Sequence, residues 1–202
     1  MKFKFFIYLF LAALSLTSCG QKHNISEFIR SELNEINEKN VHVKEVTVFE
    51  VGDNNPLLNE YLIEIGDNYL LYKALARRAH NTKMEYAAGS SRSARLNPFK
   101  KDITYNAHLD EERYGSCADE YSHMLDSVPV GTAKEVGLWV FLAYTYSIGD
   151  KSGYTSGSLY HMDKDGKTLI KKFNLQTSDN VVFTIFGHKD FEDYKSYDIK
   201  MD

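Results

Sequence analysis

The chain has 202 residues, of which 24 are Lys or Arg and 28 are Asp or Glu, so its net charge is −4 at pH 7. A mildly acidic chain whose basic residues form no dense cluster in the sequence is not expected to bind nucleic acid. Its two cysteines are too few for a disulfide framework, and its 14 Tyr and 12 Phe favour a body rich in β-structure.

The N-terminal segment has the pattern of a secretory leader. Lys2 and Lys4 make a cationic start, and an apolar run interrupted only by Ser15 extends over residues 5–16. This run is too short for a membrane-spanning helix, which needs about 20 residues, but it suits the apolar segment of a signal peptide. No later apolar run reaches spanning length, so we do not expect an integral membrane protein.

The leader ends in Leu16-Thr17-Ser18-Cys19. This string resembles the lipobox of bacterial lipoprotein precursors, in which Leu and two small residues precede an obligatory Cys. The resemblance implies cleavage before Cys19 and transfer of a diacylglycerol to its thiol. Two or three acyl chains would hold the protein stably at a membrane, because each buried methylene contributes about 0.8 kcal/mol. The alternative is an uncleaved N-terminal anchor in which Cys19 is incidental.

The resemblance divides the chain into a cleaved signal peptide (1–18), a lipidated Cys with a short polar tether (19–25) and a globular part (26–202). We expect the globular part to be a single domain, because no Pro-, Gly- or Ser-rich linker separates two halves. Gly20 stands where some lipoproteins carry the Asp that retains them in the inner membrane. The resemblance therefore implies a cell-envelope protein anchored in the outer membrane and facing the periplasm.

Helices and strands alternate in the first half of the body. The expected elements are a helix over 24–40, a strand over 41–51, a short strand over 60–65 and a helix over 69–88. In the first helix, Ile25, Ile29 and Leu33 share one face. In the first strand, the alternation of apolar and polar residues slips between Val43 and Val46, which predicts a β-bulge.

The second half of the body is dominated by strands. We expect an irregular loop region over 89–108, a helix over 110–125, strands over 135–148, 154–162, 167–175 and 180–187, and an edge strand around Tyr197. Residues 136–142 are apolar on both faces, which predicts a central strand. Short turns between successive strands predict a meander. The fold class is therefore α+β, with N-terminal helices packed on a curved antiparallel sheet and a C-terminal β-meander.

Asp163-Lys164-Asp165-Gly166-Lys167 has some likeness to a calcium-binding loop. An EF-hand places Gly at the sixth position and acidic or amide ligands at the first, third and fifth. Here Gly comes too early and Lys167 occupies the fifth position. Because Asp-Gly between two alternating runs is typical of a hairpin, we interpret the segment as a turn.

Cys117 with Asp119 and His123 raises the possibility of a thiol nucleophile with its base. Asp119 and His123 share a helical face, but Cys117 and His123 are six residues apart and do not. A catalytic Cys usually takes its His from a distant segment, and His80, His108 or His161 are available for this. No local signature supports it, so we interpret Cys117 as a buried thiol and expect no catalytic residues.

His108 with Glu111 and Glu112 has a helical spacing that a metal ion can use. It lacks the second His of a zincin motif, so we interpret it as the solvated start of a helix and expect no metal site. The sequence also has no nucleotide-binding loop, dinucleotide fingerprint or serine-hydrolase elbow, and we expect no cofactor.

Four tyrosines of the meander form the candidate binding site: Tyr144, Tyr146, Tyr154 and Tyr160. If they share one sheet face, their rings can stack on sugars or peptide; otherwise they are the ordinary wet face of a sheet. We expect a non-enzymatic envelope protein that is held at the membrane by Cys19 and binds a protein or polymer partner through the meander or the loop at 89–108. The alternatives are an envelope hydrolase, using Cys117 with a distant His or an acid–histidine pair, and a small-molecule or lipid carrier.

Overall fold

The computed structural model describes residues 20–34, 39–52, 54–130, 137–148 and 151–201. These residues form two compact units. The sheet unit takes its residues from 1–55, 132–178 and 193–202, and the hairpin unit takes 56–131 and 179–192. Within the described residues, no helix combines the length and the apolar character needed to cross a membrane. The expectation of a single domain over 26–202 stays a prediction.

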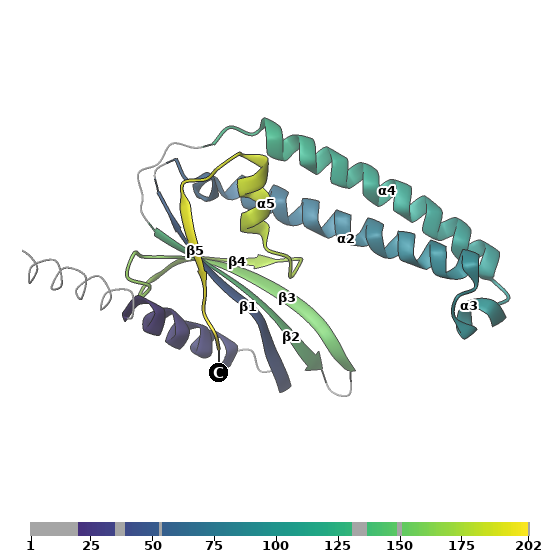
Figure 1. The fold of residues 1–202 in the computed structure, drawn as a ribbon, viewed down its shortest axis with the longest axis horizontal. Coiled ribbons are helices and arrows are strands. Elements are labelled where there is room, and N and C mark those ends of the chain that lie inside the picture. The colour runs from purple at the N-terminus through teal and green to yellow at the C-terminus, as the bar shows by residue number, and fades with distance from the viewer. Residues whose placement is uncertain (1–19, 35–38, 53, 131–136, 149–150, 202) are drawn as a thin grey trace, which may run out of the picture. The chain divides into compact units, whose positions relative to one another are not determined.

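The sheet unit contains a five-stranded antiparallel sheet with the order β4-β3-β2-β1-β5 (Figure 1). Its strands are β1 (Lys39–Val51), β2 (Gly137–Ile148), β3 (Lys151–Met162), β4 (Leu169–Leu175) and β5 (Tyr194–Asp198). The sheet is open and curved, and consecutive pairing of β2, β3 and β4 confirms the meander. Together with the helices this confirms the α+β class.

Three details of the sheet follow the sequence pattern. β2 is the middle strand, and its residues Leu138 to Leu142 are buried on both faces, as a continuous apolar run predicts. The pairing of β1 with β2 shifts register between Val43 and Glu45, which confirms the predicted bulge. β5 lies at the edge beside β1, as expected around Tyr197.

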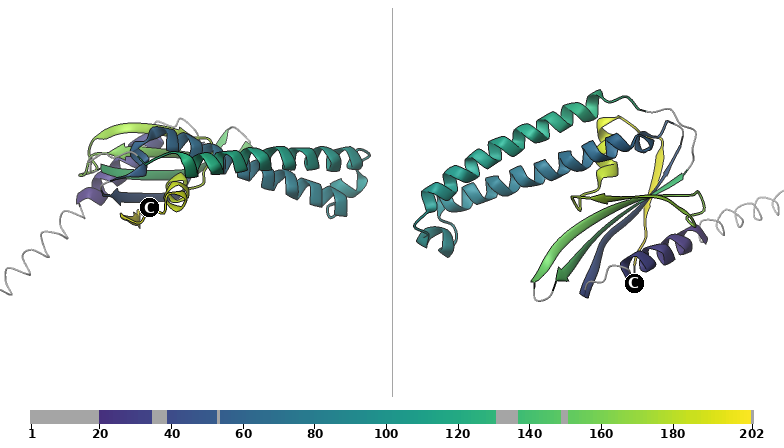
Figure 2. Two further views of the ribbon diagram at one scale, coloured as in Figure 1. Left: turned by 90° about the horizontal axis from the view of Figure 1, so that it is seen from above. Right: turned by 180° about the vertical axis from the view of Figure 1, so that it is seen from behind.

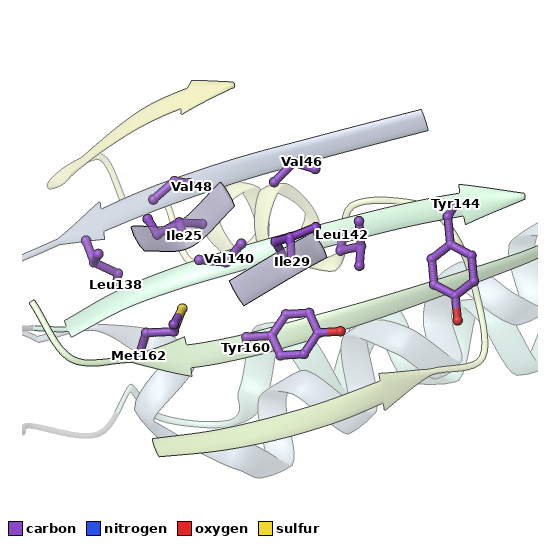
Figure 3. Close-up of a cluster of buried hydrophobic side chains, with 10 residues drawn as sticks. All are labelled: Ile25, Ile29, Val46, Val48, Leu138, Val140, Leu142, Tyr144, Tyr160 and Met162. Atoms are coloured by element: carbon purple, nitrogen blue, oxygen red, sulfur yellow. The ribbon is translucent and has the colours of Figure 1, made fainter. Parts of the chain in front are cut away.

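A helix over residues 20–34 covers one face of this sheet. Ile25 and Ile29 are fully buried there against residues of β1, β2 and β3 (Figure 3). Leu33 packs against the same cluster, so the predicted apolar face of this helix is confirmed. The buried cluster consists of Ile25, Ile29, Val46, Val48, Leu138, Val140, Leu142, Tyr144, Tyr160 and Met162.

The same helix corrects the expected tether. Residues 20–25 were expected to form a polar linker, but they are helical, and Ile25 has no exposed surface. The helix therefore begins earlier than the expected 24–40, and residues 35–38 lie outside the described part of the chain. The polar residues Gln21 and Asn24 can be part of the helix because their side chains hydrogen-bond to the β3–β4 turn, as described below.

The hairpin unit is helical. Its elements are η1 (Pro56–Leu58), α2 (Glu60–Ala88), α3 (Arg92–Leu96), α4 (Lys100–Ser127) and α5 (Val181–His188). α2 and α4 run side by side, and α3 lies at the end where they are joined (Figures 1 and 2). The hairpin buries small residues, namely Ala79 on α2 and Ala107 and Ala118 on α4. It also contains the stacked rings of Tyr72 and Tyr121, whose centroids are 5.6 Å apart. The predicted helices over 69–88 and 110–125 lie within α2 and α4 and are confirmed.

The predicted strand over 60–65 is wrong, because these residues form the first turns of α2. Asn59 caps the helix by accepting a hydrogen bond from the Tyr61 N–H on its side-chain oxygen. Leu62, Ile63 and Ile65 are buried, a spacing that a helix face also satisfies. The period-two pattern was too short to distinguish the two elements.

The predicted strand over 180–187 is also wrong, because it is the helix α5. The Asn180 side chain accepts a hydrogen bond from the Val182 N–H and caps it. Val181, Val182, Ile185 and Phe186 are buried, which places one helical face against other residues. The strand was predicted because the segment begins with the β-branched residues Val181 and Val182. In a short element, packing can override such a propensity.

The expected loop region over 89–108 is largely helical. Gly89 ends α2 with a φ of +63°, as predicted, but Ser91 then caps α3 through a hydrogen bond from the Ala94 N–H. α4 begins at Lys100, ten residues before the expected start. Its Gly115 lies inside the helix without interrupting it.

Candidate functional site

The four candidate tyrosines lie on one face of the sheet. Tyr144 and Tyr146 are two residues apart on β2 and therefore point to the same side. Across the β2–β3 ladder, Tyr154 pairs with Tyr146 and Tyr160 pairs with Val140. Since Val140 and Tyr144 both belong to the buried cluster, all four rings are on the face that the N-terminal helix covers.

One end of this row belongs to the core. Tyr160 is only 1% exposed, and its ring meets Phe28 of the N-terminal helix edge to face at 5.1 Å. Burial raises the pKa of the Tyr160 hydroxyl, so it stays protonated in the physiological range. Tyr144 is buried as well, at 9% exposure. Neither ring is available to a ligand, so the predicted binding site is reduced to Tyr146 and Tyr154.

The other end of the row is open. The ring of Tyr146 lies 5.9 Å from Tyr144 and stacks on Tyr154 at 5.5 Å with an interplanar angle of 23°. Tyr146 is half-buried, and Tyr154 is 40% exposed. We call this pair the tyrosine platform. Two stacked, partly exposed rings offer a flat amphipathic surface of the kind that sugars and peptide groups pack against.

Residues 21–24 of the N-terminal helix are held to the rest of the sheet unit by three side-chain hydrogen bonds. Gln21 Nε2 donates to the Lys164 carbonyl at 2.8 Å, and Asn24 Nδ2 donates to the Asp165 carbonyl at 3.0 Å. The Tyr197 hydroxyl donates to Gln21 Oε1 at 3.0 Å. The segment that directly follows Cys19 is therefore bound to the β3–β4 turn and to β5.

The β3–β4 turn is shaped for this contact. Gly166 has a φ of +67°, and a Cβ atom built there would lie only 2.7 Å from Ile25 Cγ1. Asp163 closes the turn, because its Oδ1 accepts a hydrogen bond from the Lys167 N–H at 2.8 Å. Burial works against ionisation of Asp163, but hydrogen bonds from the Lys167 and Thr168 N–H groups outweigh it and lower its pKa. The segment is a turn, as predicted.

The cysteine and histidine candidates are not assembled into a described site. Cys117 is half-buried on α4, while Asp119 and His123 are exposed on the same helix. His80 Nδ1 instead lies 2.8 Å from Glu111 Oε1, and His108 Nε2 lies 3.6 Å from a carboxylate on its own helix. Among the described residues, no three His, Cys, Asp or Glu side chains gather in a way that could hold a metal ion. Cys19 lies outside the described residues.

A second acid–histidine pair, His188 with Asp126, was not predicted from the sequence either. His188 Nδ1 of α5 lies 2.8 Å from Asp126 Oδ1 near the end of α4, beside an open depression that Tyr69 and Thr184 help to line. A catalytic base oriented in this way needs a nucleophile within about 3 Å, and the neighbouring Ser127 hydroxyl donates to the Met124 carbonyl. The hydrogen bond with His188 lowers the pKa of Asp126. We interpret the pair as a link between α5 and α4.

Comparison of the chain with protein-family models, with curated proteins and with solved structures finds no match.

Proposed function

We propose that the protein is a non-enzymatic lipoprotein of the cell envelope, anchored through acyl chains on Cys19, which holds a small binding module at a membrane surface. The lipobox-like string before Cys19 supports the anchor. The observation that carries the proposal further is the binding of residues 21–25 to the sheet unit. It means that a lipid on Cys19 would be attached almost directly to a folded element.

A short connection limits how far the sheet unit can move from the bilayer. An extended chain reaches at most about 3.6 Å per residue, and the chain is already helical at residue 20, the residue that follows Cys19. The sheet unit would therefore stay at the headgroup region instead of extending on a flexible stalk. We propose the outer membrane, on its periplasmic side, as the location.

The tyrosine platform is the proposed contact for an envelope polymer. Tyr146 and Tyr154 stack on each other and are partly exposed, while Tyr144 and Tyr160 belong to the buried cluster. A rigid aromatic surface loses little conformational entropy on binding and stacks on sugar rings. A glycan-containing polymer is therefore the partner class that the platform suits best.

The anchor is tested by detergent-phase partitioning of the full chain produced with its leader. We expect the parent and Cys117→Ala to enter the detergent phase, and Cys19→Ala to remain in the aqueous phase. Mass spectrometry of the N-terminal peptide should find acyl chains on Cys19. An unmodified Cys19, or detergent partitioning that survives Cys19→Ala, would refute the anchor.

The platform is tested by sedimentation with purified peptidoglycan sacculi. Each aromatic contact contributes about 0.5–1.5 kcal/mol, so we expect the variant Tyr146→Ser with Tyr154→Ser to bind roughly thirtyfold more weakly. Tyr61→Ser is the matched control, because Tyr61 is 49% exposed on α2 and lies outside the platform. Equal binding by parent and double variant, or no binding by the parent, would contradict a glycan-binding platform.

A further inference from the structure

Positive charge is concentrated at the closed end of the helical hairpin. We define the hairpin tip as residues 77–108, which comprise the last turns of α2, the helix α3 and the first turns of α4. The hairpin tip contains seven Lys or Arg and two Asp or Glu, a net charge of +5 in a chain whose total is −4. The basic residues are dispersed along the sequence, and the fold of the hairpin gathers them at one end.

The hairpin tip also exposes large apolar side chains. Leu96 is 72% exposed, Phe99 65%, Tyr105 62% and Met84 53%. These side chains come from all three helices of the tip. The region where α5 packs on α2, near Gly66, lies about 33 Å along α2 from the end of that helix at Ala88. Exposed side chains of this size, grouped within one short segment, indicate an interaction surface.

Lysines and apolar atoms meet in a shallow depression between α2 and α4. It has a volume of about 640 Å³ and is lined by the aliphatic or aromatic parts of Lys83, Lys100, Lys101 and Tyr105, with Ala87, Thr104 and His108. Lys83 forms an ion pair with Glu111. Among the residues that the structure describes, Lys100 and Lys101 have no ion-pair partner, so their charge is available to a ligand.

We propose that the hairpin tip binds the surface of a bilayer that contains anionic lipids. Lysines would pair with phosphate headgroups, and Leu96, Phe99 and Tyr105 would enter the boundary between headgroups and acyl chains. This mixture of cationic and large apolar side chains is the pattern of interfacial membrane contacts. A bilayer can take up exposed rings without having a complementary shape, whereas a protein partner needs a complementary surface. The open depression at the hairpin tip therefore suits a bilayer better than a protein partner.

This contact explains how an acidic protein can bind an anionic surface. The total charge opposes unspecific adhesion, but only charges within about 10 Å act strongly at 0.1 M salt. A bilayer that meets the hairpin tip therefore senses the local excess of positive charge around Arg92, Arg95 and Lys100 rather than the total. The proposal is independent of Cys19, and its test uses a chain without that residue.

The test is co-sedimentation of residues 20–202, which include every described element, with vesicles. One vesicle type is pure phosphatidylcholine, and the other contains equal parts of phosphatidylcholine and phosphatidylglycerol. We expect binding to the anionic vesicles that weakens as salt increases. Each Lys near an anionic surface changes affinity roughly fivefold, so Lys100→Gln with Lys101→Gln should bind about thirtyfold more weakly.

Matched variants separate the hairpin tip from the rest of the protein. Leu96→Ser with Phe99→Ser should also lose binding, whereas Ile170→Ser, at a residue 56% exposed on β4, should not. Lys195→Gln with Lys200→Gln is the control for charge, because both lysines are exposed in the sheet unit. Far-UV circular dichroism and thermal unfolding should be unchanged, since all these side chains are on the surface.

A spectroscopic readout locates the tip directly. Trp139 is the single Trp and is buried, so a Phe99→Trp variant adds one exposed fluorophore whose emission should shift to shorter wavelength on anionic vesicles. The proposal is overturned if the parent binds neither vesicle type, binds both equally, or binds as well after the tip substitutions. It is also overturned if sedimentation analysis shows a dimer that Phe99→Ser dissolves, which would assign the surface to a second copy of the chain.

Discussion

Gly166→Ala tests whether the β3–β4 turn holds the N-terminal helix in place. The substitution adds one methyl group at a residue with a φ of +67°, where the new Cβ would lie 2.7 Å from Ile25 Cγ1. It therefore introduces backbone strain and a steric overlap at the same residue. Ile25 is fully buried, so it has little room to move.

The two effects have separable magnitudes. A non-glycine residue in the left-handed region costs about 1–2 kcal/mol, and overpacking against a core side chain costs about 1–3 kcal/mol. A stiffer unfolded chain offsets about 0.4–1 kcal/mol. We expect Gly166→Ala to lower the free energy of unfolding by about 3 kcal/mol.

Gly153→Ala is the matched control. Gly153 also has a positive φ, of +90°, but a Cβ there would meet nothing within 4 Å. It should cost only the backbone strain, about 1 kcal/mol. Urea unfolding followed by Trp139 fluorescence measures both variants, because Trp139 is buried in the sheet unit.

A double-mutant cycle then isolates the contact. Ile25→Ala alone should cost about 2–5 kcal/mol, and in that background Gly166→Ala should cost no more than Gly153→Ala does. If Gly166→Ala costs the same with Ile25 and with Ala at that position, the steric argument is wrong. If Gly166→Ala and Gly153→Ala are equally destabilising in the parent, the turn does not hold the helix.

Three further predictions concern titration and packing. Burial raises the pKa of Tyr197 to about 12. The stability that its neutral hydroxyl provides should therefore be complete below pH 10 and be lost as the pH rises toward 12. Urea unfolding across this range should show the loss, and in Tyr197→Phe the free energy of unfolding should depend less on pH. Gly66→Ala should lower the melting temperature although Ala is about 1 kcal/mol better in a helix, because its Cβ would lie 2.9 Å from Val181 Cγ2; a higher melting temperature would contradict the packing. Hydrogen bonds from Lys83 and His80 lower the pKa of Glu111. The stability that this carboxylate contributes should therefore be present above pH 4.5 and be lost as the pH falls through the lowered pKa. Acid titration followed by circular dichroism should show a smaller loss of stability in Glu111→Gln.

The sequence predicted those elements whose hydrophobic pattern is long enough to be unambiguous. Ile25, Ile29 and Leu33 define a helical face over several turns, and the core cluster uses all three. The run from Leu138 to Leu142 predicts a central strand because both faces of a middle strand are covered. The turn at Gly166 was also predictable, since Asp-Gly between alternating runs has one common structure.

Short elements and surfaces required the tertiary structure. The segment Val181 to Phe186 has a strand-like composition, but it is helical because one face of α5 is buried and Asn180 caps its start. Gly66 lies inside α2, where α5 packs closely enough to leave no room for a side chain. The sequence likewise showed four tyrosines without showing that only Tyr146 and Tyr154 are accessible.

The sequence alone therefore predicted the α+β class and the consecutive pairing of β2, β3 and β4, because these depend on local patterns of hydrophobicity and turn residues. The lipid anchor and the envelope location are proposals that rest on the leader. Tertiary structure decided which side chains meet across distant segments. It bound Gln21 to the turn that contains Lys164, and it gathered Arg77, Lys83 and Lys100 at one end of a hairpin. Both results depend on long-range packing, in which residues far apart in the chain become neighbours only after the helices and the sheet have formed.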